Sequence, residues 1–149
     1  MMIESRGEYE TLIESDLVID QNRAVRDSAL LDLWLEIVSD LPQYRHFVAR
    51  NKTIPREVLR VLVEDDDREV RLTLAMRRAV GEDDELAGVL ASDLDPAIRA
   101  ALAKNPKLSP HLLVLLTQDD DEWVRDCASQ TLAQRQTHPC SDSDGIAST

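Results

Sequence analysis

The chain has 149 residues and a formal net charge of −12, from 29 acidic against 17 basic residues. That length is enough for one domain with a core of ordinary size. So negative a charge disfavours binding to nucleic acid or to anionic membrane surfaces, where Lys and Arg must neutralise phosphates. It favours a basic partner protein, or it serves solubility alone.

The composition also predicts the fold class. Hydrophobic residues make up 43% of the chain but aromatic residues only 3%, so the core must consist of Leu, Val, Ile and Ala. Side chains of this size suit short helices that pack closely together. With only four glycines and few β-branched runs, the chain does not resemble a β protein, and we expect an all-α fold.

Targeting and redox signals are weak. No apolar run reaches about 18 residues, so no membrane span is expected. The N-terminal residues MMIESRGEYE are acidic and polar, unlike a signal peptide. Cys127 and Cys140 form neither a disulfide framework nor a CxxC pair. We therefore expect a cytoplasmic protein, with Cys127 as a small buried hydrophobe.

The N-terminal part predicts helices. Residues 8–20 are expected to form a short helix, and residues 26–41 a longer amphipathic one that buries Trp34. We divide the chain into an N-terminal cap segment (residues 1–25), a helical repeat domain (26–135) and a Ser- and Asp-rich disordered tail (136–149).

A motif that occurs three times is the most informative feature of the next region. Residues 65–71 read DDDREVR, residues 93–99 read DLDPAIR, and residues 119–125 read DDDEWVR. The final arginines lie 28 and then 26 residues apart, and a degenerate copy ends at Arg45, 26 residues before Arg71. A fixed period of about 20–50 residues is typical of stacked repeats.

Each unit is predicted to contain two helices joined by the acidic turn. Apolar residues recur three and four positions apart on both sides of the turn, as helix faces require. The helix before the turn has about nine residues, too few to be stable alone, so stacking on neighbours must stabilise it. We therefore expect an α-solenoid of about four short repeats with an N-terminal capping helix.

The sequence resembles the leucine-rich repeat variant, a short relative of HEAT repeats. Residues 49–75 and 103–129 carry its pattern of D-x-D-x-x-V-R, Ala, Asn-Pro and a Pro before a Leu-rich helix; Ala103, Asn105, Pro106 and Pro110 match it best. The middle unit departs from it, with Arg77-Arg78 and Gly81 in place of Asn-Pro and Pro.

The resemblance implies a protein-binding scaffold. One member of the family carries an iron–sulfur cluster in a separate Cys-rich segment, which this chain lacks, so no cofactor is carried over. Related helical-repeat folds include enzymes that act on nucleic acid, but these need a basic concave face. A HEAT-like enzyme of that kind is therefore the less favoured alternative.

The acidic turns supply the candidate site. One N-cap uses one carboxylate, yet two of the turns contain three consecutive Asp, so capping leaves a surplus. In a stack these turns fall along one edge, which we interpret as a docking strip for a basic protein. The candidate partner-binding residues are Asp65, Asp66, Asp67, Asp93, Asp95, Asp119, Asp120, Asp121, Glu122 and Trp123.

Trp123 and the recurring arginines have separate interpretations. Trp123 replaces Glu69 and Ala97 of the other units, and is either an interface anchor or a plug at the end of the stack. The arginines form a predicted structural ladder in which each guanidinium binds a carboxylate of its own or the adjacent turn. The arginine ladder comprises Arg45, Arg71, Arg99 and Arg125.

No motif for catalysis or metal binding is visible. The three histidines lack ligand spacing, the D-x-D turns lack the Gly and distal Glu of an EF-hand loop, and no phosphate loop occurs. Cations that follow the second helices (Arg50, Lys52, Arg77, Arg78, Lys104 and Lys107) suit the helix dipoles and lack the aromatic interleaving of a nucleic-acid site.

We therefore expect no enzyme, metal or cofactor, but a non-catalytic domain that binds a basic partner through its acidic edge. A specific version is an immunity protein that inhibits a basic bacterial toxin, because opposite charge speeds association. A generic scaffold or regulatory adaptor is the alternative. The sequence names neither the partner nor the oligomeric state.

Overall fold

The computed structural model describes residues 1–138 and is all-α except for one pair of two-residue strands. The strands are β1 (Met2–Ile3) and β2 (Ser28–Ala29), which pair in parallel. The helices are α1 (Arg6–Glu14), α2 (Val18–Arg26), α3 (Leu31–Asp40), the 3-10 helix η1 (Pro42–Tyr44), α4 (Arg45–Arg50), α5 (Arg56–Leu62), α6 (Arg68–Ala75), α7 (Arg78–Gly81), α8 (Asp84–Ala91), α9 (Pro96–Ala103), α10 (Pro110–Leu116) and α11 (Glu122–Thr137).

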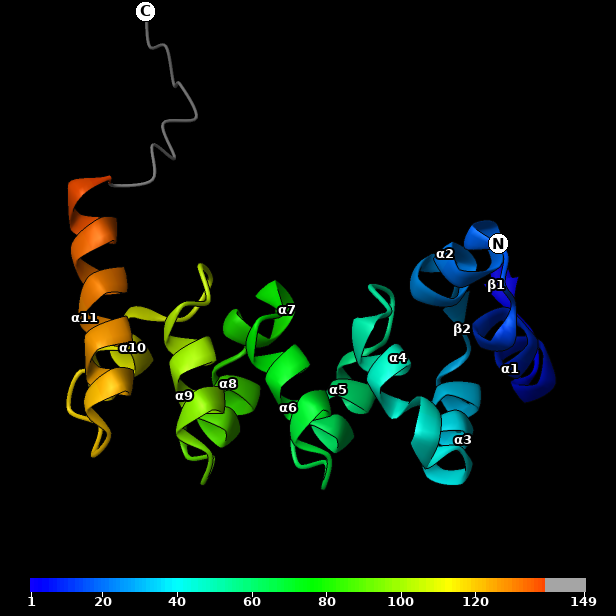
Figure 1. Cartoon of the computed structure of the whole chain (residues 1–149), viewed down its shortest axis with the longest axis horizontal. Coiled ribbons are helices and arrows are strands. Elements are labelled where there is room, and N and C mark those ends of the chain that lie inside the picture. The colour runs from blue at the N-terminus through cyan, green and yellow to red at the C-terminus, as the bar shows by residue number, and fades with distance from the viewer. Residues whose placement is uncertain (139–149) are drawn as a thin grey trace, which may run out of the picture.

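The helices follow one another along the long axis of the molecule in chain order (Figure 1). In one row α4 packs on α6, α6 on α9, and α9 on α11; in the other, α3 packs on α5 and α8 on α10. The turns that join α5 to α6, α8 to α9 and α10 to α11 all lie on one edge (Figure 1), which we call the turn edge.

The sequence explains where these helices begin. Asp67, Asp95 and Asp121 each cap the helix after the turn, and their side chains accept the N–H of the residue two positions later. Pro96 and Pro110 stand at the first position of α9 and α10, where a missing N–H costs nothing. Pro110 stands where the repeat pattern predicts a proline before a Leu-rich helix.

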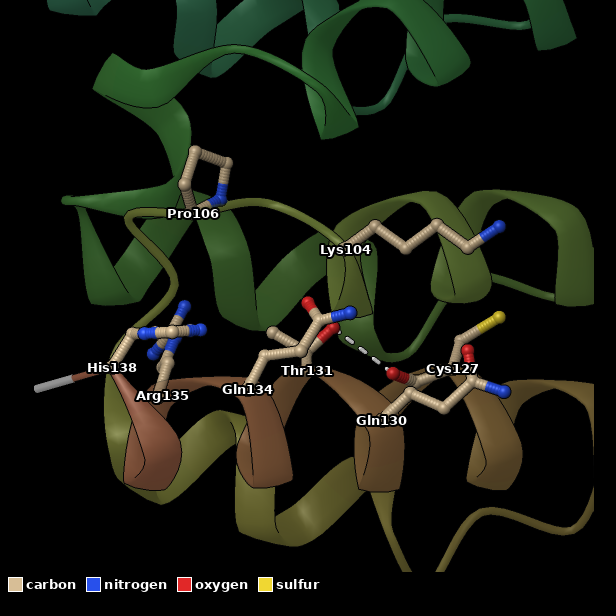
Figure 2. A pocket seen from close by; sticks show the side chains of 8 residues that line it. All are labelled: Lys104, Pro106, Cys127, Gln130, Thr131, Gln134, Arg135 and His138. Carbon is tan, nitrogen blue, oxygen red and sulfur yellow. Dashed lines mark hydrogen bonds between the residues drawn. The ribbon is translucent and has the colours of Figure 1, made fainter.

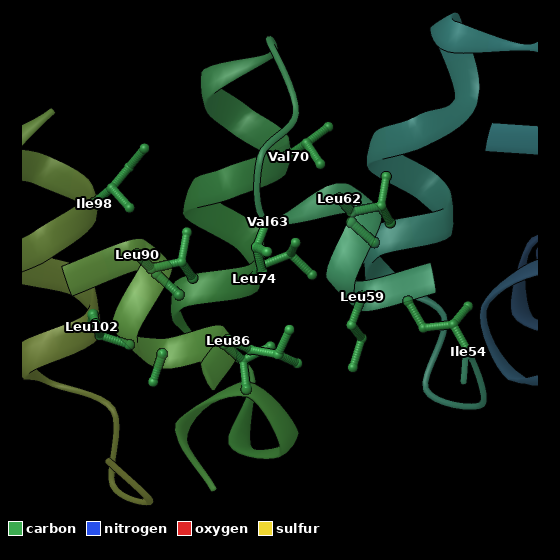
Figure 3. Close-up of a cluster of buried hydrophobic side chains, with 14 of the residues drawn as sticks. Ile54, Leu59, Leu62, Val63, Val70, Leu74, Leu86, Leu90, Ile98 and Leu102 are labelled. Atoms are coloured by element: carbon green, nitrogen blue, oxygen red, sulfur yellow. The ribbon is translucent and has the colours of Figure 1, made fainter. Parts of the chain in front are cut away.

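Aliphatic side chains form one core that runs through the length of the molecule. Figure 3 shows the part between α5 and α9, where Leu62, Leu74 and Leu90 are among the buried side chains of this core. At the N-terminal end the ring of Trp34 meets Tyr9 edge-on, with 5.6 Å between their centroids, and both rings are fully buried. The predictions that Trp34 and Cys127 are buried are confirmed.

The two ends of the chain differ from the sequence-based expectation. Residues 8–20 belong to two helices, because Ser15 ends α1 and its hydroxyl contacts the Asp20 carboxylate and the Leu17 N–H. The helix expected over 26–41 begins only at Leu31, since Ser28 and Ala29 pair with β1.

At the other end, α11 includes Gln136 and Thr137, which the sequence assigned to the tail. The remainder of the predicted tail, with Cys140, lies outside the described residues. Among residues 1–138, no helix has both the length and the hydropathy needed to cross a bilayer.

The middle unit, where the sequence departs from the family pattern, contains the short helix α7. Its last residue, Gly81, lies against the buried side chain of Asn105, whose amide donates to the carbonyls of Ala75 and Arg77. A Cβ at position 81 would be 2.5 Å from Asn105 Oδ1. Glycine at this position therefore makes room for Asn105.

We predict that Gly81→Ala destabilises the protein by about 1–3 kcal/mol, because the new methyl group displaces a buried, hydrogen-bonded amide. Gly88→Ala in α8 is the matched control: no atom lies within 4 Å of the added Cβ. That substitution should raise stability by about 0.5–1 kcal/mol through helix propensity. Urea denaturation measures both, and equal stabilities of the two variants would contradict the prediction.

Candidate protein-interaction surface

The first aspartate of each acidic turn holds the turn together. One carboxylate oxygen of Asp65, Asp93 and Asp119 accepts the backbone N–H of the third turn residue, at 2.8, 2.9 and 2.9 Å respectively. This is the Asx-turn geometry that fixes a chain reversal. The three side chains are only 4%, 7% and 9% exposed. The first aspartate of each turn, beyond the one that caps the helix, thus has a structural role.

The same three carboxylates bind the arginine ladder. Arg99 donates two parallel hydrogen bonds to Asp119, Nε to Oδ2 at 2.8 Å and Nη2 to Oδ1 at 2.9 Å. Arg71 binds Asp93 in the same way, at 2.8 and 3.5 Å, and Arg45 contacts Asp65 at 3.5 Å. The arginine of one unit therefore binds the turn of the next, one of the two arrangements expected from the sequence.

A second set of bonds ties three of the four ladder arginines to their own turns. Nη1 of Arg71, Arg99 and Arg125 donates to the carbonyl oxygen of the first turn aspartate, at 2.7, 2.6 and 2.8 Å. Each of Arg71 and Arg99 thus bridges two successive turns. Arg125 makes only the bonds to its own turn within the described residues, while Arg45 instead donates to the carbonyl of Val38.

These contacts change proton affinities in a consistent direction. The Arg99 guanidinium lowers the pKa of the Asp119 carboxyl, and Asp119 in turn raises the pKa of Arg99. The Ala97 N–H, followed by Arg68, lowers the pKa of Asp95. Both carboxyl groups are therefore held in their charged form.

The third aspartate of each turn also acts within the fold. Asp67, Asp95 and Asp121 are the helix caps described above, and Asp95 additionally binds Arg68 of the preceding unit. Six of the ten predicted partner-binding residues, the first and third aspartates, are thus engaged inside the chain.

The middle position of each turn behaves differently. Asp66, Leu94 and Asp120 are exposed, Leu94 to 97%. The backbone carbonyls of Asp66 and Asp120 accept hydrogen bonds from Arg71 and Arg125, but the side chains of all three residues make no hydrogen bond or ion pair within residues 1–138. Glu122 is also exposed and unengaged in the same part of the chain. Because Leu94 occupies the position in one unit, the fold does not require a carboxylate there. Asp66, Asp120 and Glu122 therefore remain as acids available to a partner.

Trp123 lies beside this group at the start of α11. Its side chain is 51% exposed, and Lys104 Nζ lies 5.7 Å from the ring centroid. A groove of about 910 Å³ lies between the end of α9 and the part of α11 from Cys127 onward, lined by Lys104, Cys127, Gln130 and Gln134 among others (Figure 2). Trp123 is thus half-exposed, and Lys104 both contacts its ring and lines the groove.

The sequence did not reveal a second row of ties, on the edge opposite to the turns. Asn51 donates to the carbonyls of Ala24 and Asp27, Arg77 to those of Ala49 and Asn51. Asn105 and Arg135 continue the row to the end of the molecule. Each side chain binds carbonyls at the end of the preceding helix in its row. The Asn of the Asn-Pro element, matched at Asn105, was the sequence signal that could have indicated these contacts.

Comparisons with protein-family models, curated proteins and solved structures found no match to this chain. Within residues 1–138, no group of three or more His, Cys, Asp or Glu side chains is arranged to hold a metal ion. The side chains of four predicted partner-binding residues are thus exposed and not engaged in the turns: Asp66, Asp120, Glu122 and Trp123. These four residues are the candidate site, which we call the binding strip.

We predict that Arg99→Gln lowers the free energy of unfolding by about 2–4 kcal/mol, because it leaves the Asp119 carboxylate almost buried without its cation. Arg99→Lys should lose part of the same stabilisation, since an ammonium cannot reproduce the two parallel hydrogen bonds. Arg60→Gln is the control: Arg60 contacts Glu85 at 2.6 Å, but its side chain is 63% exposed. Its loss should hardly be detected in urea denaturation. A similar cost for both Gln variants would contradict a special role for the ladder.

Asp119 also predicts a pH dependence. Its folded-state pKa lies below the unfolded value of about 3.9. The stabilisation is therefore complete above about pH 5 and is lost as the pH falls through 3.9 toward the folded-state pKa. Asp119→Asn should flatten the acid limb of a stability-versus-pH curve measured by thermal unfolding. An unchanged acid limb would show that the Arg99–Asp119 pair does not stabilise the fold.

Proposed function

We propose that this chain is a non-catalytic protein-binding domain built as an α-solenoid of leucine-rich-variant type. It binds a basic partner protein through the binding strip. One observation carries the proposal: the side chains of Asp66 and Asp120 are exposed on the turn edge and make no hydrogen bond or ion pair within residues 1–138, while the aspartates on either side of them are engaged in the fold.

The charge and the geometry of the edge support a basic partner. The net charge of −12 attracts a cationic protein at long range and speeds its encounter. The arginine ladder holds successive turns at fixed spacing, so their middle residues form a preorganised row that loses little entropy on binding. Trp123 at the end of this row supplies the apolar contact that dominates many interfaces.

A specific version of the proposal is an inhibitor of a basic toxin, as an immunity protein is. Such an inhibitor must bind before the toxin acts, and electrostatic steering gives the fast association that this requires. The turn edge would then cover cationic residues that the toxin uses on its own target.

A scaffold or adaptor is the second candidate, and the groove between α9 and α11 favours it. This groove is open, about 910 Å³ in volume, and combines apolar surface with amide side chains from Gln130 and Gln134. A partner that entered it would be held mainly by apolar contacts, so its affinity would respond weakly to salt.

We predict that Asp66→Lys combined with Asp120→Lys weakens partner binding by at least about tenfold while leaving helicity unchanged. The partner is to be captured on the immobilised chain from a lysate of the native host and then titrated by calorimetry. Its affinity for the wild type should fall steeply between about 50 and 200 mM salt. Circular dichroism checks the fold of the variant.

The matched control is Asp16→Lys combined with Asp32→Lys, which makes the same change of net charge at exposed acids outside the three acidic turns. It should keep near-wild-type affinity. A complex that is insensitive to salt and to the turn-edge variant, but is lost in Gln130→Lys, would replace the basic-partner proposal with the adaptor.

A further inference from the structure

The basic side chains of this acidic protein are almost all engaged. Within residues 1–138, thirteen of them contact acids, backbone carbonyls or, in Lys104, the ring of Trp123. The side chains that remain without such a contact there are Arg26, Arg50, Lys52 and Arg78, and all four are exposed.

Three of these four cations surround one hollow. Arg50, Lys52 and Arg78 line a depression of about 540 Å³ between the ends of α2, α4 and α6, and α7 forms part of its wall. Val25, which precedes the fourth cation, lines it as well. We call this depression the basic hollow. The uncommitted positive charge of a chain with a net charge of −12 is thus concentrated at one place.

The walls of the basic hollow are fixed relative to one another. Arg77 donates to the carbonyls of Ala49 and Asn51, at 2.8 and 2.7 Å, which ties the end of α6 to the end of α4. The amide of Asn51 binds the carbonyl of Ala24, and the Lys52 N–H binds that of Val25 at 3.0 Å, which ties α4 to α2. A ligand therefore meets a preformed site.

The lining between the cations is apolar. Val25, Ala49, Ala79 and Met76 contribute to it, and the Met76 side chain is exposed. Methionine is unbranched and polarisable, so it adapts to different apolar partners. The combination of three cations with an adaptable apolar surface fits a peptide that carries carboxylates on either side of an apolar residue.

A nucleic acid fits this hollow less well. Its backbone would continue past the hollow onto the acidic surface of the molecule, where phosphates are repelled. The lining residues also include no aromatic ring on which a base could stack.

We propose that the basic hollow binds an acidic peptide segment of a partner protein, whose carboxylates pair with the three cations while an apolar side chain rests on Met76. This inference does not depend on a basic partner at the turn edge, because the hollow is formed by the opposite ends of the helices. Together the two surfaces would let one domain join partners of opposite charge.

The test uses fluorescence anisotropy of the full chain with a fluorescein-labelled peptide of sequence Glu-Leu-Glu-Glu-Leu-Glu. The wild type should bind it saturably, and Arg50→Glu, Lys52→Glu and Arg78→Glu together should weaken binding by at least about tenfold. Met76→Asp should weaken binding as well. Should the triple variant lose helicity, the milder Arg50→Gln with Arg78→Gln replaces it, with the same direction of effect.

The matched control removes three exposed cations elsewhere, by Arg6→Glu, Arg60→Glu and Lys107→Glu, with the same change of net charge. Equal losses in the two triple variants would overturn the proposal, because net charge alone would then explain binding. Tighter binding of a labelled oligothymidylate than of the peptide would overturn it in favour of a polyanion site. Absence of saturable peptide binding to the wild type would also overturn it.

Discussion

The bidentate contact between an arginine and the first aspartate of the following turn is the interaction on which the arrangement of the helices depends. The helices are short, several with eight residues or fewer, and cannot persist without neighbours. Apolar packing joins the rows, but packing alone tolerates sliding. Arg71 and Arg99 each hold their own turn through a carbonyl and the next turn through a carboxylate, so they fix the register between units. Removing one partner of such a shielded pair is costly, because the other charge is left without compensation.

The opposite edge is fixed by different chemistry. There, Asn51, Arg77 and Asn105 bind backbone carbonyls at the ends of preceding helices, so uncharged or cationic donors serve the same purpose. Carboxylates thus gather at the turn edge, while the opposite edge is mixed: the acidic residues 82–85 stand at the junction of α7 and α8, and three cations without a structural task line the basic hollow. The acidic character of the turn edge is thus a consequence of how that edge is held together.

The sequence predicted the features that depend on local spacing. Asp-x-Asp turns, Pro96 and Pro110 marked the helix starts, and the repeated arginine indicated a ladder, because each of these signals lies within a few residues. It could not reveal that Asp65, Asp93 and Asp119 are almost buried, since that depends on an arginine about twenty residues away. Nor could it predict the contact of Gly81 with Asn105 or the pairing of β1 with β2, which join distant segments without any periodic pattern. Of the candidate site, Asp66, Asp120, Glu122 and Trp123 keep the exposure that a partner needs.

Leu94 has a consequence for how such a surface could change over time. It replaces a carboxylate at the centre of a turn whose neighbours on both sides, Asp93 and Asp95, still perform their tasks. Substitution at the middle position of a turn therefore changes the chemistry of the exposed surface without disturbing the contacts that hold the turn. A lineage could exchange Asp66, Leu94 or Asp120 freely and so acquire new binding preferences on an unchanged scaffold.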